Sequence, residues 1–321
     1  MKDSFGRNIE YLRISVTDRC NLRCQYCMPE EGVHALQHDE ILRFEEICRI
    51  VEAAAQLGIH KFRITGGEPL ARKGIVGLID QLHRIPGVKE LVMTTNGTLL
   101  ADQAEALSKA GLNRVNISLD SLRPDRYKEI TRGGNLQDVF DGINQALRAG
   151  LGPVKINVVV VGGFNDDEIL DFAQLSLNHH LTVRFIELMP IGTAGGEHGA
   201  QMVSNQIIKE RLSGLVPVEE TAPGEVAEYY RFRGALGKIG FISPLSRHFC
   251  AACNKIRLTP DGKLKPCLHT EEEIDLRPAL DTGDPKILLE TIRQTIASKN
   301  ERHHLNEGAT PIQRDMNRIG G

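Results

Sequence analysis

Several features that would point to particular classes of protein are missing from this sequence of 321 residues. It has no run of about 18 uninterrupted apolar residues, which argues against a membrane span. The segment Met1–Arg7 has no apolar core, so we expect no secretory signal and a cytoplasmic location. The formal net charge is only −3, so nothing in the overall balance requires nucleic acid or an anionic membrane as a partner. Hydrophobic residues (41%) and charged residues (25%) occur in ordinary globular proportions, which argues against a disordered chain.

The seven cysteines are more informative than these absences. Three form a first cysteine set with the spacing C-x3-C-x2-C, namely Cys20, Cys24 and Cys27. Three others form a second cysteine set with the spacing C-x2-C-x13-C, namely Cys250, Cys253 and Cys267. The odd total and the reducing compartment make a disulfide framework a poor explanation, and clustered thiols there favour metal binding.

The first part of the chain alternates short β-branched runs with longer amphipathic segments. Strands are predicted at Tyr11–Val16, Lys61–Thr65, Glu90–Thr94, Arg114–Leu119, Val154–Val161 and Thr182–Glu187. Helices are predicted between them at Phe44–Leu57, Ile75–Arg84, Asp102–Ala110, Leu136–Ala149 and Asp166–Asn178. Six such repeats imply an α/β fold with parallel strands. The pattern fits either a partial barrel or a doubly wound sheet, because six repeats are too few for a closed eight-stranded barrel.

The pattern changes after the glycine-rich stretch Pro190–Gly196. Hairpin-like strands are predicted at Val226–Arg233, Lys238–Ile242 and Lys255–Thr259, with a turn at Pro260-Asp261-Gly262. Helices are expected at Glu271–Leu276 and Pro285–Ser298. We therefore expect a domain over residues 1–190 and a C-terminal α+β domain over residues 191–321.

The first cysteine set directly follows the first predicted strand, at the sheet edge where parallel α/β domains bind ligands. Structural zinc normally takes four protein ligands, so a zinc site would need His34 or His38 in addition. A 4Fe-4S cluster held by three cysteines keeps one iron free for a substrate or cofactor. The spacing and the strand context favour the cluster.

The C-x3-C-x2-C pattern with Tyr26 before its last cysteine resembles the signature of radical S-adenosylmethionine (radical SAM) enzymes. The resemblance implies a 4Fe-4S cluster whose free iron chelates the methionine moiety of S-adenosylmethionine. Reduction then cleaves this cofactor to a 5′-deoxyadenosyl radical. The family fold is a partial (βα)6 barrel of the TIM type, in agreement with the six repeats.

Further residues gain expected roles from this resemblance. The sequence Thr-Gly-Gly-Glu-Pro at residues 65–69 would otherwise be a simple turn between strand and helix. The resemblance implies that Gly67 meets the methionine amino group of the cofactor. It also implies that Ser118 binds the ribose or the carboxylate and that Met189 faces the adenine, although a lone methionine is usually a core residue. Tyr26 completes the expected cofactor-binding residues.

Taken alone, the second cysteine set could hold a structural zinc with His248 or His269 as fourth ligand. Paired with the first set, it resembles the GTP 3′,8-cyclase family of molybdenum cofactor biosynthesis. This implies a second 4Fe-4S cluster that contacts the guanine of GTP, and conversion of GTP to (8S)-3′,8-cyclo-7,8-dihydroguanosine 5′-triphosphate. It further implies a homodimer, a separate reductant protein, and a product passed to cyclic pyranopterin monophosphate synthase.

A nucleoside triphosphate would have to be held mainly by side chains, because the chain has neither G-x-x-x-x-G-K-[ST] nor G-x-G-x-x-G. Arginine and lysine in or beside apolar strands are the candidates, since a buried cation is costly without a partner. The expected GTP-binding residues are Arg13, Arg63, Thr94, Lys155, Arg184, Lys255 and Arg257. Some family members have arginine in place of Lys255. The resemblance also implies that Gly320-Gly321, which would usually be a frayed end, reaches into the active site.

Two rival functions remain to be considered. A different two-cluster radical SAM enzyme that modifies peptides would usually have more cysteines in its C-terminal region. A two-zinc module that binds RNA or protein would leave the six β-α units unexplained, and the charge of −3 offers it no broad basic face.

Overall fold

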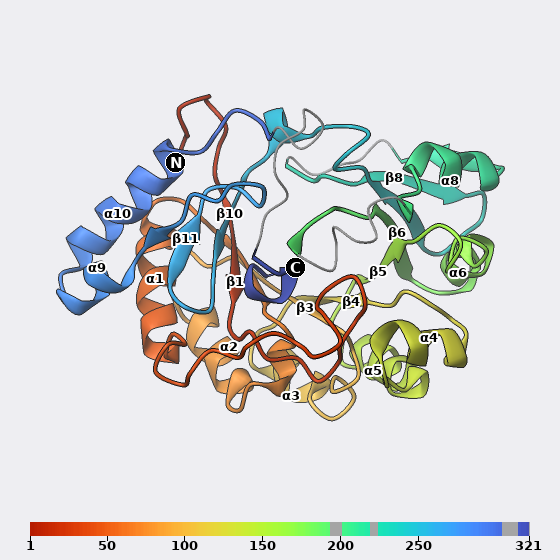
Figure 1. The fold of residues 1–321 in the computed structure, drawn as a ribbon, viewed down its shortest axis with the longest axis horizontal. Helices are drawn as coiled ribbons and strands as arrows, with labels where there is room; N and C mark the ends of the chain where they lie inside the picture. Colours follow the sequence, from red (N-terminus) through yellow and green to blue (C-terminus); the bar gives the residue numbers. More distant parts are fainter. Residues whose placement is uncertain (193–200, 219–223, 304–313, 321) are drawn as a thin grey trace.

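The computed structural model of the chain describes residues 1–192, 201–218, 224–303 and 314–320 (Figure 1). Within them, twelve strands form one sheet in the order β12-β11-β10-β1-β2-β3-β4-β5-β6-β9-β8-β7. The glycine-rich stretch beyond Gly192 and the final Gly321 lie outside the described residues. No described helix is long and apolar enough to cross a membrane.

Six parallel strands form the middle of the sheet in chain order. They are β1 (Tyr11–Ser15), β2 (Lys61–Thr65), β3 (Glu90–Thr95), β4 (Arg114–Ser118), β5 (Val154–Val160) and β6 (Leu181–Glu187). All six predicted strands are confirmed to within one residue at each end. A doubly wound sheet would reverse its strand order part-way along, whereas this order never reverses. The partial barrel is therefore the correct alternative.

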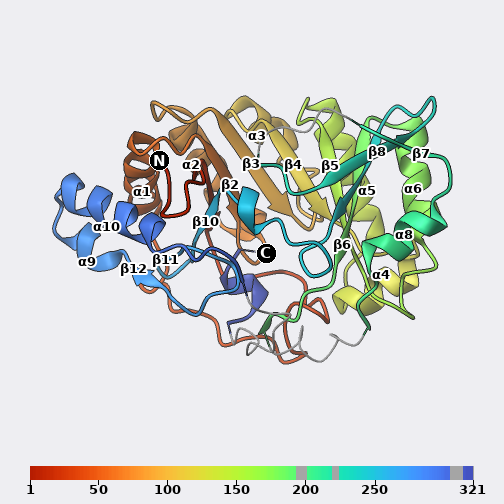
Figure 2. The same ribbon diagram turned by 90° about the horizontal axis from the view of Figure 1, so that it is seen from above.

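Helices follow the strands of the barrel and cover one face of the sheet. They are α1 (Phe44–Gln56), α2 (Ile75–His83), α3 (Ala104–Lys109), α4 (Pro124–Thr131), α5 (Leu136–Arg148) and α6 (Ile169–Asn178). Alternate strand residues such as Leu12, Ile14, Phe62 and Ile64 are fully or almost fully buried in the core on this face. Figure 2 shows the helices on this outer side and the C-terminal end of the chain on the opposite, inner side.

The C-terminal part of the chain extends the same sheet at both edges. Strand β10 (Lys255–Leu258) pairs with β1 in parallel, and β9 (Lys238–Ile242) pairs with β6 in parallel. Beyond them the strands are antiparallel: β11 (Lys263–Lys265), β12 (Ile274–Asp275), β8 (Glu228–Phe232) and β7 (Leu215–Pro217). The predicted turn at residues 260–262 indeed joins β10 to β11.

Some predicted elements differ in the structure. The helix expected at Glu271–Leu276 is wrong, since this segment contains β12 and the helix α9 begins later, at Arg277–Asp281. Glu273 is held by Lys265 on the neighbouring strand, a contact that replaces a helical first turn. The helices α4 and α8 (Asn205–Arg211) were not anticipated, whereas α10 (Pro285–Ala297) agrees with expectation.

Candidate active site

The first cysteine set lies in the loop that follows β1, at the carboxyl edge of the parallel strands. All three thiols are partly buried. The backbone N–H of Leu22 donates to the sulfur of Cys20 at 3.4 Å, and the Cys27 N–H donates to the carbonyl of Cys24 at 2.9 Å. These turns keep the three cysteines within one short loop.

The four expected cofactor-binding residues lie at the same carboxyl edge. Gly67 and Met189 come two residues after β2 and β6, and Ser118 ends β4. A Cβ at Gly67 would lie 2.4 Å from the carbonyl oxygen of Arg19, so only glycine lets this turn pack against the cysteine loop. The Tyr26 hydroxyl donates to Asp120 at 2.6 Å, a partner that the sequence did not reveal. Burial raises the pKa of Asp120 to about 6.

The second cysteine set lies at the opposite end of the same strands. Cys250 and Cys253 immediately precede β10, and Cys267 follows the antiparallel β11. Because Tyr11 pairs with Lys255, this set lies at the amino end of β1, whereas the first set follows the carboxyl end. At about 3.3 Å per residue, the five-residue strand separates the two sets by roughly 17 Å.

Between the two sets, the inner face of the sheet carries a row of cations. Arg13 pairs with Arg257 on one side and with Arg63 on the other, and residues paired across parallel strands project to the same face. The pairing of the other strands places the remaining expected GTP-binding residues on this same face. All seven expected GTP-binding residues, Arg13, Arg63, Thr94, Lys155, Arg184, Lys255 and Arg257, project to it.

Polar side chains link the members of this cation row. Arg63 donates to the Thr94 hydroxyl at 3.0 Å and to the Tyr11 hydroxyl. With its amide oxygen turned towards the cations, Asn116 accepts from both Arg63 and Arg184. Lys155 donates to Glu225 at 2.8 Å and to Tyr229 at 3.0 Å. Asn116 and Glu225 are therefore additional members of the site that sequence reasoning missed.

The cations lie close enough to perturb one another. Burial, and then the charges of Arg257 and Arg63, hold the pKa of Arg13 well below its usual value. Burial lowers the pKa of Arg184 and of Arg257 to about 10. It also lowers the pKa of Lys255 to about 8. So many mutually repelling cations in a buried row favour an anionic ligand that neutralises them.

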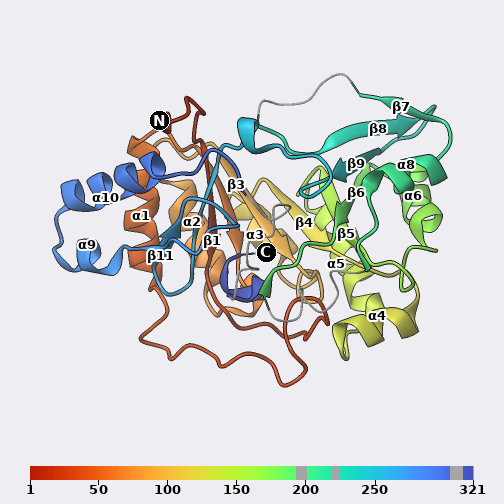
Figure 3. The same cartoon turned by 45° about the horizontal axis from the view of Figure 1, so that its top comes forward.

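The C-terminal tail lies on the inner side of the sheet, opposite the helices (Figures 1 and 3). Ile319 is fully buried, and Arg257 donates to the carbonyl oxygens of Ile319 (3.2 Å) and Gly320 (2.6 Å). Gly320 has a φ of +72°, and a Cβ there would lie 2.4 Å from the hydroxyl of Thr65. Asn317 donates to the Asp18 carbonyl at 2.8 Å, beside the first cysteine set. The described part of the tail thus reaches from the first set to the cation row.

The spacing of the thiols tests which metal group each set could hold. Over the described residues, neither set brings its three sulfurs within 4.8 Å of one another. A tetrahedral zinc with bonds of about 2.3 Å would hold them about 3.8 Å apart. In the part of the chain that the structure describes, neither His34 nor His38 joins a compact ligand group. Each set of three thiols is spread more widely than one zinc ion requires, which fits a 4Fe-4S cluster with one open iron. Among the described residues, Cys250 is the one member of either set that lies in a compact group with histidines, namely His248 and His303.

Two buried cations that the sequence did not single out hold the backbone of the second set. Arg7 is paired with Asp3 at 2.6 Å and donates to the carbonyls of Cys250 (2.9 Å) and Glu301 (2.7 Å). Lys299 is only 2% exposed and donates to the carbonyls of Lys255 (3.0 Å) and Pro266 (2.5 Å). Together they fix the segments that carry all three cysteines.

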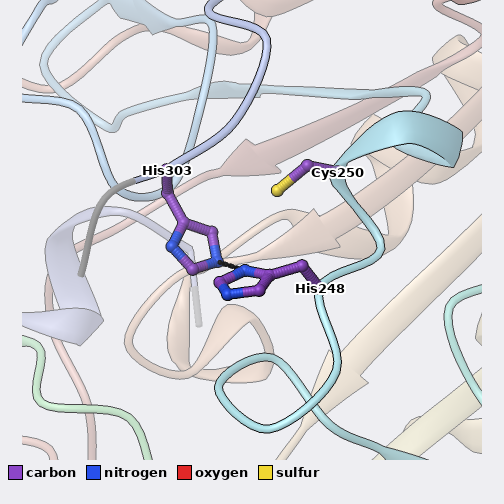
Figure 4. Close-up of side chains that lie close together, drawn as sticks. All are labelled: His248, Cys250 and His303. Atoms are coloured by element: carbon purple, nitrogen blue, oxygen red, sulfur yellow. Dashed lines mark hydrogen bonds between the residues drawn. The ribbon is translucent and has the colours of Figure 1, made fainter. Parts of the chain in front are cut away.

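Three histidines surround the second set. His248 and His303 approach each other at 3.1 Å between Nδ1 and Nε2, with the sulfur of Cys250 beside them (Figure 4). The ring of His269 lies 4.5 Å from that of His303, and its backbone N–H donates to Cys267. His248 and His269, the two histidines that the sequence suggested as zinc ligands, therefore both contact His303. Sequence reasoning missed His303.

Comparison with known proteins agrees with this geometry. Residues 14–176 match the model of the Radical SAM superfamily, and residues 181–305 match that of Molybdenum Cofactor Synthesis C. A protein of Alkaliphilus metalliredigens (strain QYMF) named GTP 3′,8-cyclase is 54% identical over the full length of both chains. The chain belongs to the GTP 3′,8-cyclase family of radical SAM enzymes. Another member of this family, from Pelotomaculum thermopropionicum, is 52% identical, again over the full length of both.

Solved structures share the fold of this family member at low sequence identity. Streptococcus suis SuiB bound to a precursor peptide is 14% identical, with a TM-score of 0.65 over 97% of this chain and 76% of that one. SuiB bound to S-adenosylmethionine gives a TM-score of 0.63 over 97% of this chain and 77% of that one. They support the α/β partial barrel. The family itself uses iron–sulfur clusters and S-adenosylmethionine as cofactors.

Proposed function

We propose that this protein converts GTP to (8S)-3′,8-cyclo-7,8-dihydroguanosine 5′-triphosphate in molybdenum cofactor biosynthesis. The relatives named GTP 3′,8-cyclase support the reaction. The observation that carries the proposal is the placement of two three-thiol sets at opposite ends of β1 with a buried cation row between them. Such a site suits an anionic nucleotide that lies along the cation row between the two cysteine sets.

The first part of the mechanism is binding of the cofactors. Cys20, Cys24 and Cys27 would hold one 4Fe-4S cluster, and Cys250, Cys253 and Cys267 would hold the other. The chemistry that the first cluster supplies together with S-adenosylmethionine is a 5′-deoxyadenosyl radical able to remove the hydrogen atom at ribose C3′. We assign S-adenosylmethionine binding to Tyr26, Gly67, Ser118 and Met189. Their common position at the carboxyl edge of the parallel strands supports this assignment. Asp120 then acts on Tyr26 by fixing its hydroxyl.

The second part is positioning of the nucleotide. The cation row would neutralise about four negative charges of the triphosphate, and arginines suit bidentate contacts with phosphate oxygens. Thr94 and Asn116 hold Arg63 and Arg184 in place, so their guanidinium groups are oriented before the substrate binds. Such preorganisation matters because a reactive radical must meet one C–H bond only, in a site from which water is excluded.

The decisive experiment is anaerobic reconstitution of the full-length chain with iron and sulfide. We expect about eight irons per chain, four for each cluster. GTP should be consumed only when S-adenosylmethionine and a reductant are both present, and a cysteine-containing peptide should remain unmodified. Two tightly bound zinc ions without iron, or turnover of the peptide instead of GTP, would contradict the proposal.

A substitution of Arg257 tests the assignment of the cation row. A charged hydrogen bond contributes about 1.5–3 kcal/mol, so Arg257→Gln should weaken GTP binding by roughly tenfold or more in calorimetry. The matched control is Arg293→Gln, which removes an exposed arginine of α10 that pairs with its helix neighbour Glu290. Equal affinity in both variants would remove Arg257 from the site.

The remaining parts of the proposal concern organisation and partners. We place the first cysteine set in a domain of residues 1–190 and the second in a domain of residues 191–321. The family resemblance supports a homodimer in the cytoplasm, a separate reductant protein, and delivery of the product to cyclic pyranopterin monophosphate synthase. Sedimentation of the purified chain at twice the monomer mass would support the dimer, and sedimentation at the monomer mass would contradict it.

A further inference from the structure

One compact group of metal-ligand atoms differs from both three-thiol sets. Across the described residues, His248, Cys250 and His303 form the one group of three such atoms that all lie within 4.8 Å of one another. The two histidines come from distant parts of the chain, one before the short 3-10 helix at Cys250–Ala252 and one after α10. In Figure 4 the two rings face each other across their hydrogen bond, and the sulfur of Cys250 lies beside them.

The distances in this group suit a single small ion. Tetrahedral zinc with Zn–N bonds of about 2.0–2.1 Å holds two nitrogen ligands about 3.3 Å apart. The observed separation of His248 Nδ1 and His303 Nε2 is 3.1 Å, where the two rings share a hydrogen bond. Zinc would therefore displace the proton between these nitrogens and the thiol proton of Cys250, and both would be released to solvent. Two imidazoles and one thiolate form a donor set of the kind that zinc prefers, with the fourth position left for water.

The group combines a buried member, which orders it, with an exposed member, which lets an ion reach it. His303 is only 9% exposed, and its ring packs between those of His248 and His269 at 4.5 Å from each. His248 is exposed, so an ion can enter from solvent. Arg7 meanwhile fixes the backbone carbonyl of Cys250. The three donors are therefore held close together by their surroundings.

We propose that His248, Cys250 and His303 bind one Zn²⁺ ion in the full-length chain before the second cluster is loaded, and that zinc and this cluster exclude each other. The exclusion rests on the proposed function, because it requires Cys250 to be a cluster ligand. The zinc site does not rest on it. Zinc binds nitrogen and sulfur ligands more tightly than Fe²⁺ does, so zinc at this site opposes iron loading.

The site can be tested with Co²⁺, a coloured substitute for zinc. The protein is the full-length chain with Cys20, Cys24 and Cys27 replaced by serine, purified anaerobically without iron, so that the first set contributes no signal. We expect one Co²⁺ per chain, a charge-transfer band of one thiolate ligand, and displacement by Zn²⁺. His303→Gln and His248→Gln should each weaken binding by at least about tenfold, the low end of what loss of even an outer partner costs.

Two further variants separate this site from a zinc held by the three thiols. Cys253→Ala and Cys267→Ala remove the other members of the second set and should leave Co²⁺ affinity unchanged. Circular dichroism and thermal melting confirm that each variant is folded, and the unfolded ones are replaced by the conservative serine variants. A band of three thiolates, loss of binding in Cys253→Ala, or full affinity in His303→Gln would overturn the proposal.

The exclusion has its own measurement. In the same background, iron loading without zinc should give about four irons per chain. One equivalent of Zn²⁺ added first should abolish most of this uptake, and His303→Gln should restore it. If zinc did not reduce iron uptake, or reduced it equally in the His303→Gln variant, zinc and the second cluster would not exclude each other. Failure to load iron under any condition would instead contradict the proposed function, because the Co²⁺ titration is independent of iron.

Discussion

The two cysteine sets have the same number of thiols but lie in different electrostatic surroundings. Around the first set, burial and then the neighbouring thiols and acids, including Asp120, raise the pKa of Cys24 well above its usual value. Burial likewise raises the pKa of Cys27 to about 12, with Asp315 adding to the shift. Around the second set, burial raises the pKa of Cys250 as well. Burial alone would also raise the pKa of Cys253, yet Lys299, Lys255 and Arg7 hold it below its usual value.

This contrast has a consequence for electron transfer. Reduction adds a negative charge to a cluster, so acidic neighbours lower a reduction potential and cationic neighbours raise it. A low potential suits the end of the site where a cofactor must be cleaved reductively. A cationic environment suits the end that must accept the anionic substrate. Equal thiol counts therefore do not imply equal chemistry, and the neighbouring charges distinguish the two ends.

The largest expected effect comes from removing one cysteine from each set. Cys24→Ala should abolish cleavage of S-adenosylmethionine altogether, because the first set would no longer hold a complete group. Cys253→Ala should retain some cleavage that is uncoupled from GTP while losing the cyclised product. Chromatographic measurement of 5′-deoxyadenosine and product in both variants separates the two roles. Equal loss of both activities in both variants would show that the ends do not have distinct functions.

A smaller change in the charge around the second set should shift its potential without removing a ligand. In the Cys24→Ala background, Lys299→Met should make the remaining cluster harder to reduce, with a more negative potential in a titration followed by electron paramagnetic resonance. Lys299→Gln keeps a hydrogen-bond donor for the carbonyls of Lys255 and Pro266 but lacks the charge.

Comparing Lys299→Met with Lys299→Gln separates the effect of the ammonium charge on the reduction potential from the effect of its hydrogen bonds. A similar negative shift in both would mean that the ammonium charge sets the potential, whereas an unshifted Lys299→Gln would mean that the carbonyl contacts do. Lys286→Met, on the exposed start of α10, is the control for loss of one positive charge elsewhere. A shift as large in this control would contradict a local effect of Lys299.

The same comparison shows what the sequence could and could not provide. Local patterns predicted the six strands almost to the residue, because each is a short β-branched run bounded by turns. They could not reveal that the two sets share β1, since that depends on pairing between Tyr11 and Lys255, far apart in the chain. The family resemblance supplied the cation row as a set of residues, and only the register showed that all of its members project to one face.

The residues that sequence reasoning missed are those whose environment depends on long-range contacts. Arg7 and Lys299 look like ordinary surface cations in the sequence, and only packing buries them against the second set. The false helix at Glu271–Leu276 has the opposite cause. Its three consecutive glutamates resemble an acidic first helical turn, but the cations of β11 draw Glu273 into strand contacts instead.

The smallest predicted effect concerns Lys255, the member of the cation row next to the second set. Its pKa of about 8 in the folded protein means that its charge is present at pH 7 and mostly lost at pH 9. GTP affinity should therefore fall as the pH rises through 8, by at most about tenfold per pH unit for this group. Lys155, whose pKa is also about 8, should contribute similarly.

Lys255→Arg isolates the contribution of Lys255. Arginine stays protonated over this range, so the variant should show a shallower decline in GTP affinity, with the remaining slope due to Lys155. Unfolding does not explain the loss of affinity. The pKa of Lys255 in the folded state lies below the ordinary lysine value of 10.5, so this group makes the folded state more stable as the pH rises from about 8. Calorimetric titration of GTP at pH 7, 8 and 9 compares the two proteins, and identical slopes would show that Lys255 does not bind the nucleotide.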